Sequence, residues 1–239
     1  FRIGLRDMLG VRARLYWKLA DKVGRIEDVR VSPNEPRVVG EISVDLDRGD
    51  YHLQVTCDGV LRDWPIWVVS KVDWTQLTGW SKHDPAQEFD DLDLPGGDHL
   101  ITTVLDRQAV DRAKSGANIV AVLAAQGTAP MPFWRECAFE FAPGLMEDFA
   151  GHWHRLWGIA TDRAIDPEWL RRTFGDYEVL MNRVDTRTYR EHPYLVRAKV
   201  GKGTVTVTTL RPQGGHGAQP HGVTKNPSGS VFLATLVRS

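Results

Sequence analysis

The strongest constraint on the fold is a change of pattern near residue 98 of this 239-residue chain. Before that point, residues 38–46 and 51–57 alternate apolar and polar side chains, which is typical of strands that bury one face. After it, near-continuous apolar strands alternate with helical segments. The pattern therefore predicts two regions of different architecture.

The first region reads as antiparallel strands. A third strand is expected at residues 64–69, and Asp58-Gly59 is a dipeptide typical of hairpin turns. Residues 1–70 are therefore expected to form a small β-sandwich fragment, within which residues 12–20 fit either a strand or a short helix. Residues 71–97 are polar and rich in turn residues, which favours a linker.

The second region, residues 98–239, opens with a β-α-β pattern. Asp106 is placed to cap a helix over residues 107–114, between apolar strands at residues 99–105 and 119–123. Such a unit predicts neighbouring parallel strands joined by a right-handed crossover.

Further elements follow in the same region. Helices are expected over residues 133–141 and 149–157, and another after Asp166-Pro167. A strand at residues 177–184 and a hairpin over 195–210 come next, and a last helix begins at Asn226-Pro227. The predicted fold class is α/β, with a small antiparallel β-sandwich part followed by a three-layer domain that has a mostly parallel sheet.

Two segments resemble glycoside hydrolase family 2 proteins, which include β-galactosidases. Residues 49–69, from Gly-Asp-Tyr-His-Leu to Trp-Pro-Ile-Trp-Val-Val, resemble the last strands of their Ig-like sandwich. Residues 200–210, with Gly201-Lys202-Gly203 and a later Asn226-Pro227 helix start, are similar to their C-terminal glutamine-amidotransferase-like domain. The same arrangement occurs in the trimerisation-type domains of β-galactosidases.

This resemblance implies that the chain is a non-catalytic accessory module with a role in architecture, oligomer contact or the rim of an active site. Its expected partners are an upstream catalytic barrel of the same polypeptide and further copies of the chain in a homo-oligomer. The chain begins at Phe1 without an initiator Met, and we expect it to be a fragment. Amidotransferase chemistry needs a cysteine at a strand-to-helix turn. Because Ala124-Ala125-Gln126 follows the strand at 119–123, we expect that chemistry to be lost.

Charge and hydropathy argue against two classes of partner. Lys and Arg number 30 and Asp and Glu number 31, so no basic excess favours nucleic acid. No apolar run approaches the roughly 20 residues that span a bilayer. Cytosolic and secreted origins both stay open, with a soluble cytoplasmic protein favoured.

No cofactor is expected. The two histidines of His152-Trp153-His154 would point apart on a helix, so a shared metal is not expected.

The densest polar cluster follows the strand at 177–184. We expect that strand in the parallel sheet, where ligands bind beyond the carboxyl ends of strands. The cluster could hold a sugar or an acid group, or it could be a salt-bridged loop that fixes packing. Its candidate ligand-binding residues are Asn182, Arg183, Asp185, Arg187 and Tyr189.

His216 is a further candidate, in the Gly/Pro/His-rich loop of residues 211–222. That loop could cover a neighbouring site as a lid or simply connect a strand to a helix. With the 182–189 cluster it supports an alternative function, in which the chain is a stand-alone carbohydrate-binding or hydrolytic protein.

Overall fold

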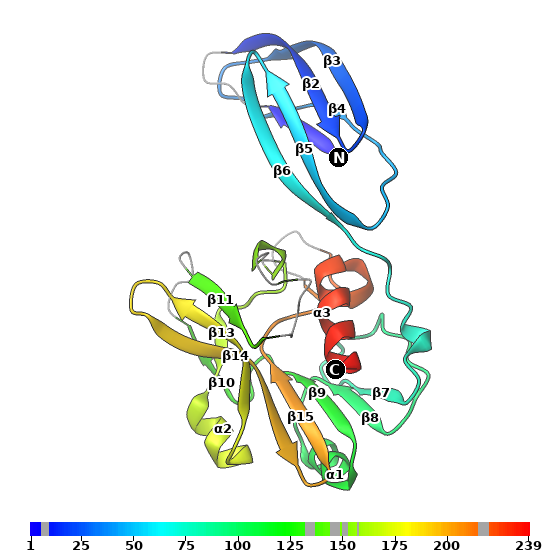
Figure 1. The fold of residues 1–239 in the computed structure, drawn as a ribbon, viewed down its shortest axis with the longest axis vertical. Helices are drawn as coiled ribbons and strands as arrows, with labels where there is room; N and C mark the ends of the chain where they lie inside the picture. Colours follow the sequence, from blue (N-terminus) through cyan, green and yellow to red (C-terminus); the bar gives the residue numbers. More distant parts are fainter. Residues whose placement is uncertain (6–9, 132–136, 144–148, 150–152, 157, 215–219) are drawn as a thin grey trace. The chain divides into compact units, whose positions relative to one another are not determined.

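A computed structural model shows two compact units, Phe1–Ser70 and Lys71–Ser239 (Figure 1). It describes residues 1–5, 10–131, 137–143, 149, 153–156, 158–214 and 220–239. None of the helices in this described part of the chain has the length and apolar character needed to cross a bilayer.

The first unit is built from two antiparallel sheets. A four-stranded sheet has the order β3-β2-β5-β6, and a two-stranded sheet pairs β1 with β4. The strands are β1 (Arg2–Leu5), β2 (Val11–Leu19), β3 (Lys22–Val31), β4 (Arg37–Glu41), β5 (Gly49–Cys57) and β6 (Val60–Val68). The expected strands at 51–57 and 64–69 are present, and residues 12–20 are strand rather than helix. The strand expected over 38–46 ends at Glu41.

Alternation explains the core of this unit. Leu15 and Leu19 of β2 and Leu53 and Val55 of β5 are buried, and Ile42 joins them. Neighbouring residues of the same strands point to solvent because successive side chains face opposite sides of a sheet.

The second unit is organised around a seven-stranded sheet of order β11-β13-β14-β15-β9-β8-β7. The strands are β7 (Trp80–His83), β8 (His99–Thr102), β9 (Asn118–Val122), β11 (Cys137–Phe141), β13 (Glu178–Asp185), β14 (Arg190–Val200) and β15 (Gly203–Thr208). Strands β7, β8, β9 and β15 run parallel to one another, whereas β15, β14, β13 and β11 pair antiparallel. The sheet is therefore mixed, where the sequence predicted a mostly parallel one.

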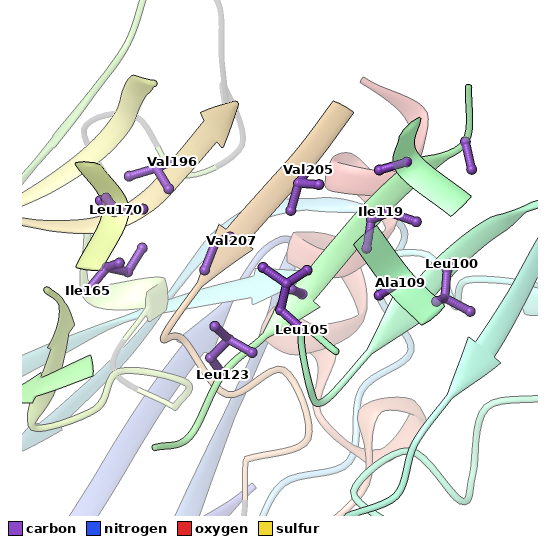
Figure 2. Close-up of a cluster of buried hydrophobic side chains, with 13 residues drawn as sticks. Leu100, Leu105, Ala109, Ile119, Leu123, Ile165, Leu170, Val196, Val205 and Val207 are labelled. Atoms are coloured by element: carbon purple, nitrogen blue, oxygen red, sulfur yellow. The ribbon is translucent and has the colours of Figure 1, made fainter. Parts of the chain in front are cut away.

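Helices lie on both faces of this sheet. They are α1 (Arg107–Ser115), α2 (Pro167–Phe174) and α3 (Pro227–Arg238), with short 3-10 turns η1 (Trp74–Gln76), η2 (Trp153–Leu156) and η3 (Val223–Lys225), and a small ribbon of β10 (Thr128–Pro130) and β12 (Arg163–Ile165). Figure 2 shows Ala109 of α1 and Leu170 of α2 in one cluster with Val205 and Val207 of β15. Leu236 of α3 instead lies with Thr206, on the opposite face of β15.

Further predictions about the second unit differ from the structure. Residues 71–97 are not only a linker, because β7 joins the sheet beside β8. Residues 137–141, expected in a helix, form strand β11 against β13. Of the helix expected at 149–157, Trp153–Leu156 is a 3-10 turn. Residues 132–136, 150–152 and 157 lie outside the described residues.

Two glycines shape the hairpin turn between β14 and β15. A Cβ at Gly201, whose φ is +62°, would lie 2.6 Å from Cα of Lys114. A Cβ at Gly203 would lie 2.0 Å from the carbonyl oxygen of Ala117. The backbone N–H of Lys202 donates to the carbonyl of Lys114 at 3.2 Å. The turn therefore packs backbone to backbone against the C-terminal end of α1, which explains the Gly-Lys-Gly sequence.

The residue before each of the three α-helices is an N-cap, as the sequence predicts for Asp106 and as the predicted starts at Asp166-Pro167 and Asn226-Pro227 indicate. The side chain of Asp106 accepts from the N–H of Ala109 at 3.0 Å, and that of Asp166 from Glu168 at 2.8 Å. The side chain of Asn226 accepts from Gly229 at 3.1 Å.

Replacing Asp166 with alanine is expected to lower the free energy of unfolding by about 1 kcal/mol, because one N–H at the start of α2 loses its acceptor. Urea denaturation followed by circular dichroism measures this. Asp176→Ala, at an exposed position just beyond α2, is the matched control and should change stability by less than about 0.5 kcal/mol. Equal effects of the two changes would contradict the capping role.

Candidate functional site

The carboxyl ends of β7, β8, β9 and β15 meet at one edge of the seven-stranded sheet, because these strands are parallel. Open α/β sheets bind ligands beyond this edge. Two parts of the chain lie there: residues 84–92, which follow β7, and residues 211–214 and 220–224, which follow β15.

The segment of residues 84–92 is held by hydrogen bonds at both ends. Asp84 accepts from the backbone N–H groups of Glu88 at 3.1 Å and Phe89 at 2.6 Å, and from the Thr103 hydroxyl at 3.1 Å. The ammonium group of Lys82 donates to the carbonyl oxygens of Phe89 and Leu92, each at 2.9 Å. The Phe89 ring is fully buried and anchors the segment.

Glu88 is the centre of a polar cluster that joins the two segments. Its Oε2 accepts from Arg211 Nη2 at 3.3 Å and Gln213 Nε2 at 2.9 Å, and lies 3.0 Å from His221 Nε2. We call these four residues the edge network. Arg211 Nε and Gln213 Oε1 are buried without a partner among the described residues.

Asp91 makes a second connection between the segments. Its carboxylate accepts from the backbone N–H groups of Val223 at 3.1 Å and Thr224 at 2.7 Å, and from the Thr224 hydroxyl at 2.7 Å. Gly222 has φ +132°, and a Cβ there would lie 2.6 Å from Asp91 Oδ2. The approach of the carboxylate thus requires glycine at position 222.

Both carboxylates are held in the ionised form. Burial alone would raise the pKa of Glu88, but hydrogen bonds from His221 and Gln213 and the charge of Arg211 more than offset it, so its pKa is lowered. Burial would also raise the pKa of Asp91. The hydrogen bonds that Thr224 and Val223 donate to its carboxylate outweigh this effect, so the pKa of Asp91 is lowered as well. A glycosidase acid needs a raised pKa, so neither group is suited to that role.

The polar side chains in the turn after β9 and at the end of β7 bind neighbouring loops. The side-chain amide of Gln126 accepts from the backbone N–H of Leu105 and donates to its carbonyl, both at 2.9 Å. His83 Nε2 lies 2.8 Å from Asp106 Oδ2, and Asp106 also caps α1. The polar side chains here fix loops and contact no cysteine or serine nucleophile in the described part of the chain.

The residues predicted from sequence lie on the antiparallel half of the sheet. Strand β13 is antiparallel to β14 and β14 is antiparallel to β15, so β13 runs in the same direction as β15. Residues 186–189 form the turn between β13 and β14, so the 182–189 cluster is at the same edge as the carboxyl ends of the parallel strands, with β14 between it and β15. Asp185 accepts from the Arg187 N–H at 2.9 Å and from the Thr188 hydroxyl at 2.8 Å. Tyr189 is 83% exposed.

The structure separates the other members of this cluster. Asn182 donates to Glu191 at 2.8 Å on an exposed surface, whereas Arg183 is buried and donates to the Tyr194 hydroxyl. His216 lies outside the described residues. No group of three or more His, Cys, Asp or Glu suited to a metal ion occurs among residues that the structure describes.

Sequence reasoning missed the edge network because its members are far apart in the chain. Glu88 is separated from Gln213 by 125 positions and from His221 by 133. The available signal was that Glu88 comes five positions after β7 and Arg211 three positions after β15, which becomes informative once both strands are known to be parallel.

Comparison with known proteins does not assign the chain to a family. No family model matches the chain, and no curated protein matches it. The cold-adapted β-galactosidase from Rahnella sp. R3 is 15% identical, with a TM-score of 0.30 over 62% of this chain and 24% of that one. The β-galactosidase from Bacillus circulans sp. alkalophilus is 14% identical, with a TM-score of 0.26 over 61% of this chain and 23% of that one. The matched parts are thus about a quarter of those enzymes, and at these TM-scores the likeness assigns neither fold nor function.

Proposed function

We propose that this chain is a non-catalytic accessory module of a carbohydrate-active enzyme of the glycoside hydrolase family 2 type, with a role in architecture. The observation that supports the proposal is the edge network. At the edge where an α/β sheet would bind a substrate, the oxygens of Glu88 and Asp91 accept hydrogen bonds from residues 213 and 224 and Glu88 lies against His221, which holds these parts of the chain in place. The family is suggested by the sequence resemblance in residues 49–69 and 200–227.

The ionisation of the two acids fits this role. A catalytic proton donor must be protonated near neutral pH, whereas the lowered pKa of Glu88 keeps it charged and bound to its donors. Hydrogen bonds to a charged carboxylate are stronger than those between neutral groups, so an ionised Glu88 stabilises the fold more than a protonated one would.

An immunoblot of source cells with an antibody raised against the chain tests the accessory role. A band several times larger than the chain would support a module of a longer enzyme. A band at the size of the chain itself would overturn it. Hydrolysis of nitrophenyl glycosides by the purified chain, abolished by Glu88→Gln, would also overturn the non-catalytic role.

The acid stability of the second unit should depend on Glu88. Its pKa is lowered from 4.5, so as the pH falls the unfolded chain takes up a proton before the folded chain does. The stabilisation is therefore complete above pH 4.5 and is lost as the pH falls through the lowered pKa of the folded state. Glu88→Gln is expected to cost about 1–3 kcal/mol at pH 7 and to flatten the loss of stability in acid.

Urea unfolding at a series of pH values measures both effects. Glu178→Gln, at an exposed position of β13, is the matched control and should leave the acid limb unchanged. An unchanged acid limb in Glu88→Gln would show that the carboxylate does not hold the segment.

One observation favours a second candidate, a stand-alone carbohydrate-binding protein. Tyr189 presents its ring to solvent on the hairpin turn next to Arg187, and exposed aromatic rings offer a face on which sugar rings can stack. Under this proposal Tyr189→Ala weakens binding to an oligosaccharide array about tenfold, since a lost contact of about 1.4 kcal/mol has that effect. Tyr16→Ala, at an exposed tyrosine of β2, is the control and should leave binding unchanged. Absence of sugar binding by the unmodified chain would rule the candidate out.

A further inference from the structure

The outer face of the four-stranded sheet in the first unit carries side chains that the core does not use. Leu15 and Leu19 of β2 and Leu53 of β5 point to the inner face, where they are buried in the core of the unit. Tyr16 and Lys18 point outward, because successive side chains of a strand face opposite sides of the sheet. We call this outward side the open face, and Figure 1 shows the four strands that form it.

The strand register places eight side chains of the open face in two rows across the four strands. They are Val23, Lys18, Gln54 and Asp63 in one row and Arg25, Tyr16, Thr56 and Leu61 in the next. All of them except Asp63 line one hollow of about 600 Å³. A second hollow, of about 690 Å³, lies beside it and shares Tyr16 and Thr56 with it. The open face is therefore hollowed rather than flat.

Apolar side chains are exposed around these hollows. Val23 is 72% exposed, Tyr16 51% and Leu61 53%. They come from three different strands, β3, β2 and β6, so they are spread across the open face. Several exposed apolar groups around a hollow are typical of a surface that another protein covers.

Basic residues outnumber acidic ones on the half of the open face that β2 and β3 form. The basic residues are Arg12, Arg14, Lys18, Arg25 and Arg30, and the acidic ones are Glu27 and Asp28. Each of the two acids pairs with two arginines, at distances of 2.8–3.1 Å. Because two carboxylates are shared among so many cations, this half of the face keeps a net positive charge.

The other half of the open face, formed by β5 and β6, is acidic. Asp63 Oδ1 lies 2.7 Å from His52 Nδ1, and its Oδ2 accepts a hydrogen bond from Gln54 at 3.3 Å. The hydrogen bonds with His52 and Gln54 lower the pKa of Asp63, so its carboxyl group is ionised at pH 7. Asp58, in the turn between β5 and β6, lines the same hollow as Tyr16. The open face is thus positive on one half and negative on the other.

A face divided in this way complements a second copy of itself. When two such faces meet about a two-fold axis that runs parallel to the strands, between β2 and β5, the basic half of each copy covers the acidic half of the other. Lys18 of one copy then lies near the partner's Asp63, and the exposed apolar side chains of both copies are covered. A nucleic acid or another polyanion would match only the basic half.

The open face is large enough for such a contact. Strands β2, β5 and β6 have nine residues each, and β3 has ten. Nine residues at about 3.3 Å each give a length of about 30 Å, and four strands about 4.8 Å apart give a width of about 19 Å. Two faces of this size bury about 1,100 Å² in total, which is near the lower limit for a specific interface. We therefore expect association of moderate strength.

We propose that two copies of this chain form a symmetric dimer through the open face of the first unit. Attraction between the basic and acidic halves fixes the relative orientation of the two sheets. Tyr16, Val23 and Leu61 of each copy pack into the hollows of the other, where their apolar surface is removed from water. This proposal is independent of the accessory role, which it neither requires nor contradicts.

Sedimentation equilibrium of the full chain and of two charge-reversal variants tests the interface. Lys18→Glu and Asp63→Lys should each raise the dissociation constant of the dimer by about tenfold or more, because like charges then face each other. An equimolar mixture of the two variants should dimerise again, because each introduced charge meets an opposite charge in the mixed dimer. Lys199→Glu, at an exposed position of β14 in the second unit, is the matched control and should dimerise like the unmodified chain.

A chain that stays monomeric up to about 200 μM would overturn the proposal, as would dimerisation that both charge reversals leave unchanged or a mixture that stays monomeric. Hydroxyl-radical footprinting of the unmodified chain provides a test that does not depend on the folding of the variants. Labelling of Tyr16 and Leu61, relative to that of the exposed Tyr189, should fall at least about threefold between dilute and concentrated protein. A dimer in which this ratio does not change would use another surface and would overturn the proposal.

Discussion

Replacing Phe232 with alanine is expected to lower the free energy of unfolding by about 3–5 kcal/mol. Phe232 is fully buried in α3, and its ring meets that of Phe149 edge to face, with centroids 6.2 Å apart and an interplanar angle of 82°. Truncation removes this contact and leaves a cavity beneath a helix whose neighbouring residues Leu233 and Leu236 are also buried.

Urea denaturation followed by tryptophan fluorescence measures the effect on Phe232→Ala. Arg238→Ala, at the exposed end of the same helix, is the control and should stay within about 0.5 kcal/mol of the unmodified chain. A loss below about 1 kcal/mol for Phe232→Ala would show that α3 does not pack as described.

A second large effect is expected from a much smaller change, Gly203→Ala. The added methyl group would lie 2.0 Å from the carbonyl oxygen of Ala117 and 2.6 Å from that of Ala113. Both contacts are with backbone at the end of α1, so no side-chain rotation can relieve them. The hairpin turn must move away from α1, which also breaks the bond from the Thr204 N–H to Ala117. We expect a loss of about 3 kcal/mol, the upper end for overpacking.

A change at Lys202, the neighbouring residue, tests whether any substitution in this turn destabilises the chain. Lys202 is exposed, so Lys202→Ala should be nearly neutral in the same denaturation experiment. If Gly203→Ala were as stable as Lys202→Ala, the close approach of the turn to α1 would be wrong.

Local features of the second unit could be predicted from the sequence because their causes are local. Asp106, Asp166 and Asn226 each precede a helix and accept a hydrogen bond from its first turn, and the sequence pattern indicates each of them. The β-α-β unit around α1 is likewise confirmed, with β8 parallel to β9.

Features set by distant partners could not be predicted in this way. The apolar residues at 137–141 suit either a helix or a strand. They form a strand because they pair with β13, which lies some 40 positions further along the chain. Phe139 then packs near Tyr194, with ring centroids 5.9 Å apart. Strand β13 pairs with β14 in a hairpin and not with a parallel neighbour, so the 182–189 cluster lies on the antiparallel half of the sheet, with β14 between it and β15.

The edge network was missed for the same reason. Nothing near Glu88 in the sequence indicates that its partners are Arg211, Gln213 and His221. Conversely, Arg183 was identified from sequence as a residue that could hold an acid group, but its burial and its bond to Tyr194 could be learned only from the fold.

The position of β15 at the junction of the two halves of the sheet has a consequence for the order of folding. On one side it pairs with β14 through a tight turn, and on the other with β9, where Thr204 and Asn118 are 86 positions apart. Closing a short loop costs less chain entropy than closing a long one, so the hairpins should form before the parallel half assembles. Until β9 arrives, one edge of β15 is unpaired and can pair with another chain. Refolding yield should therefore fall as protein concentration rises.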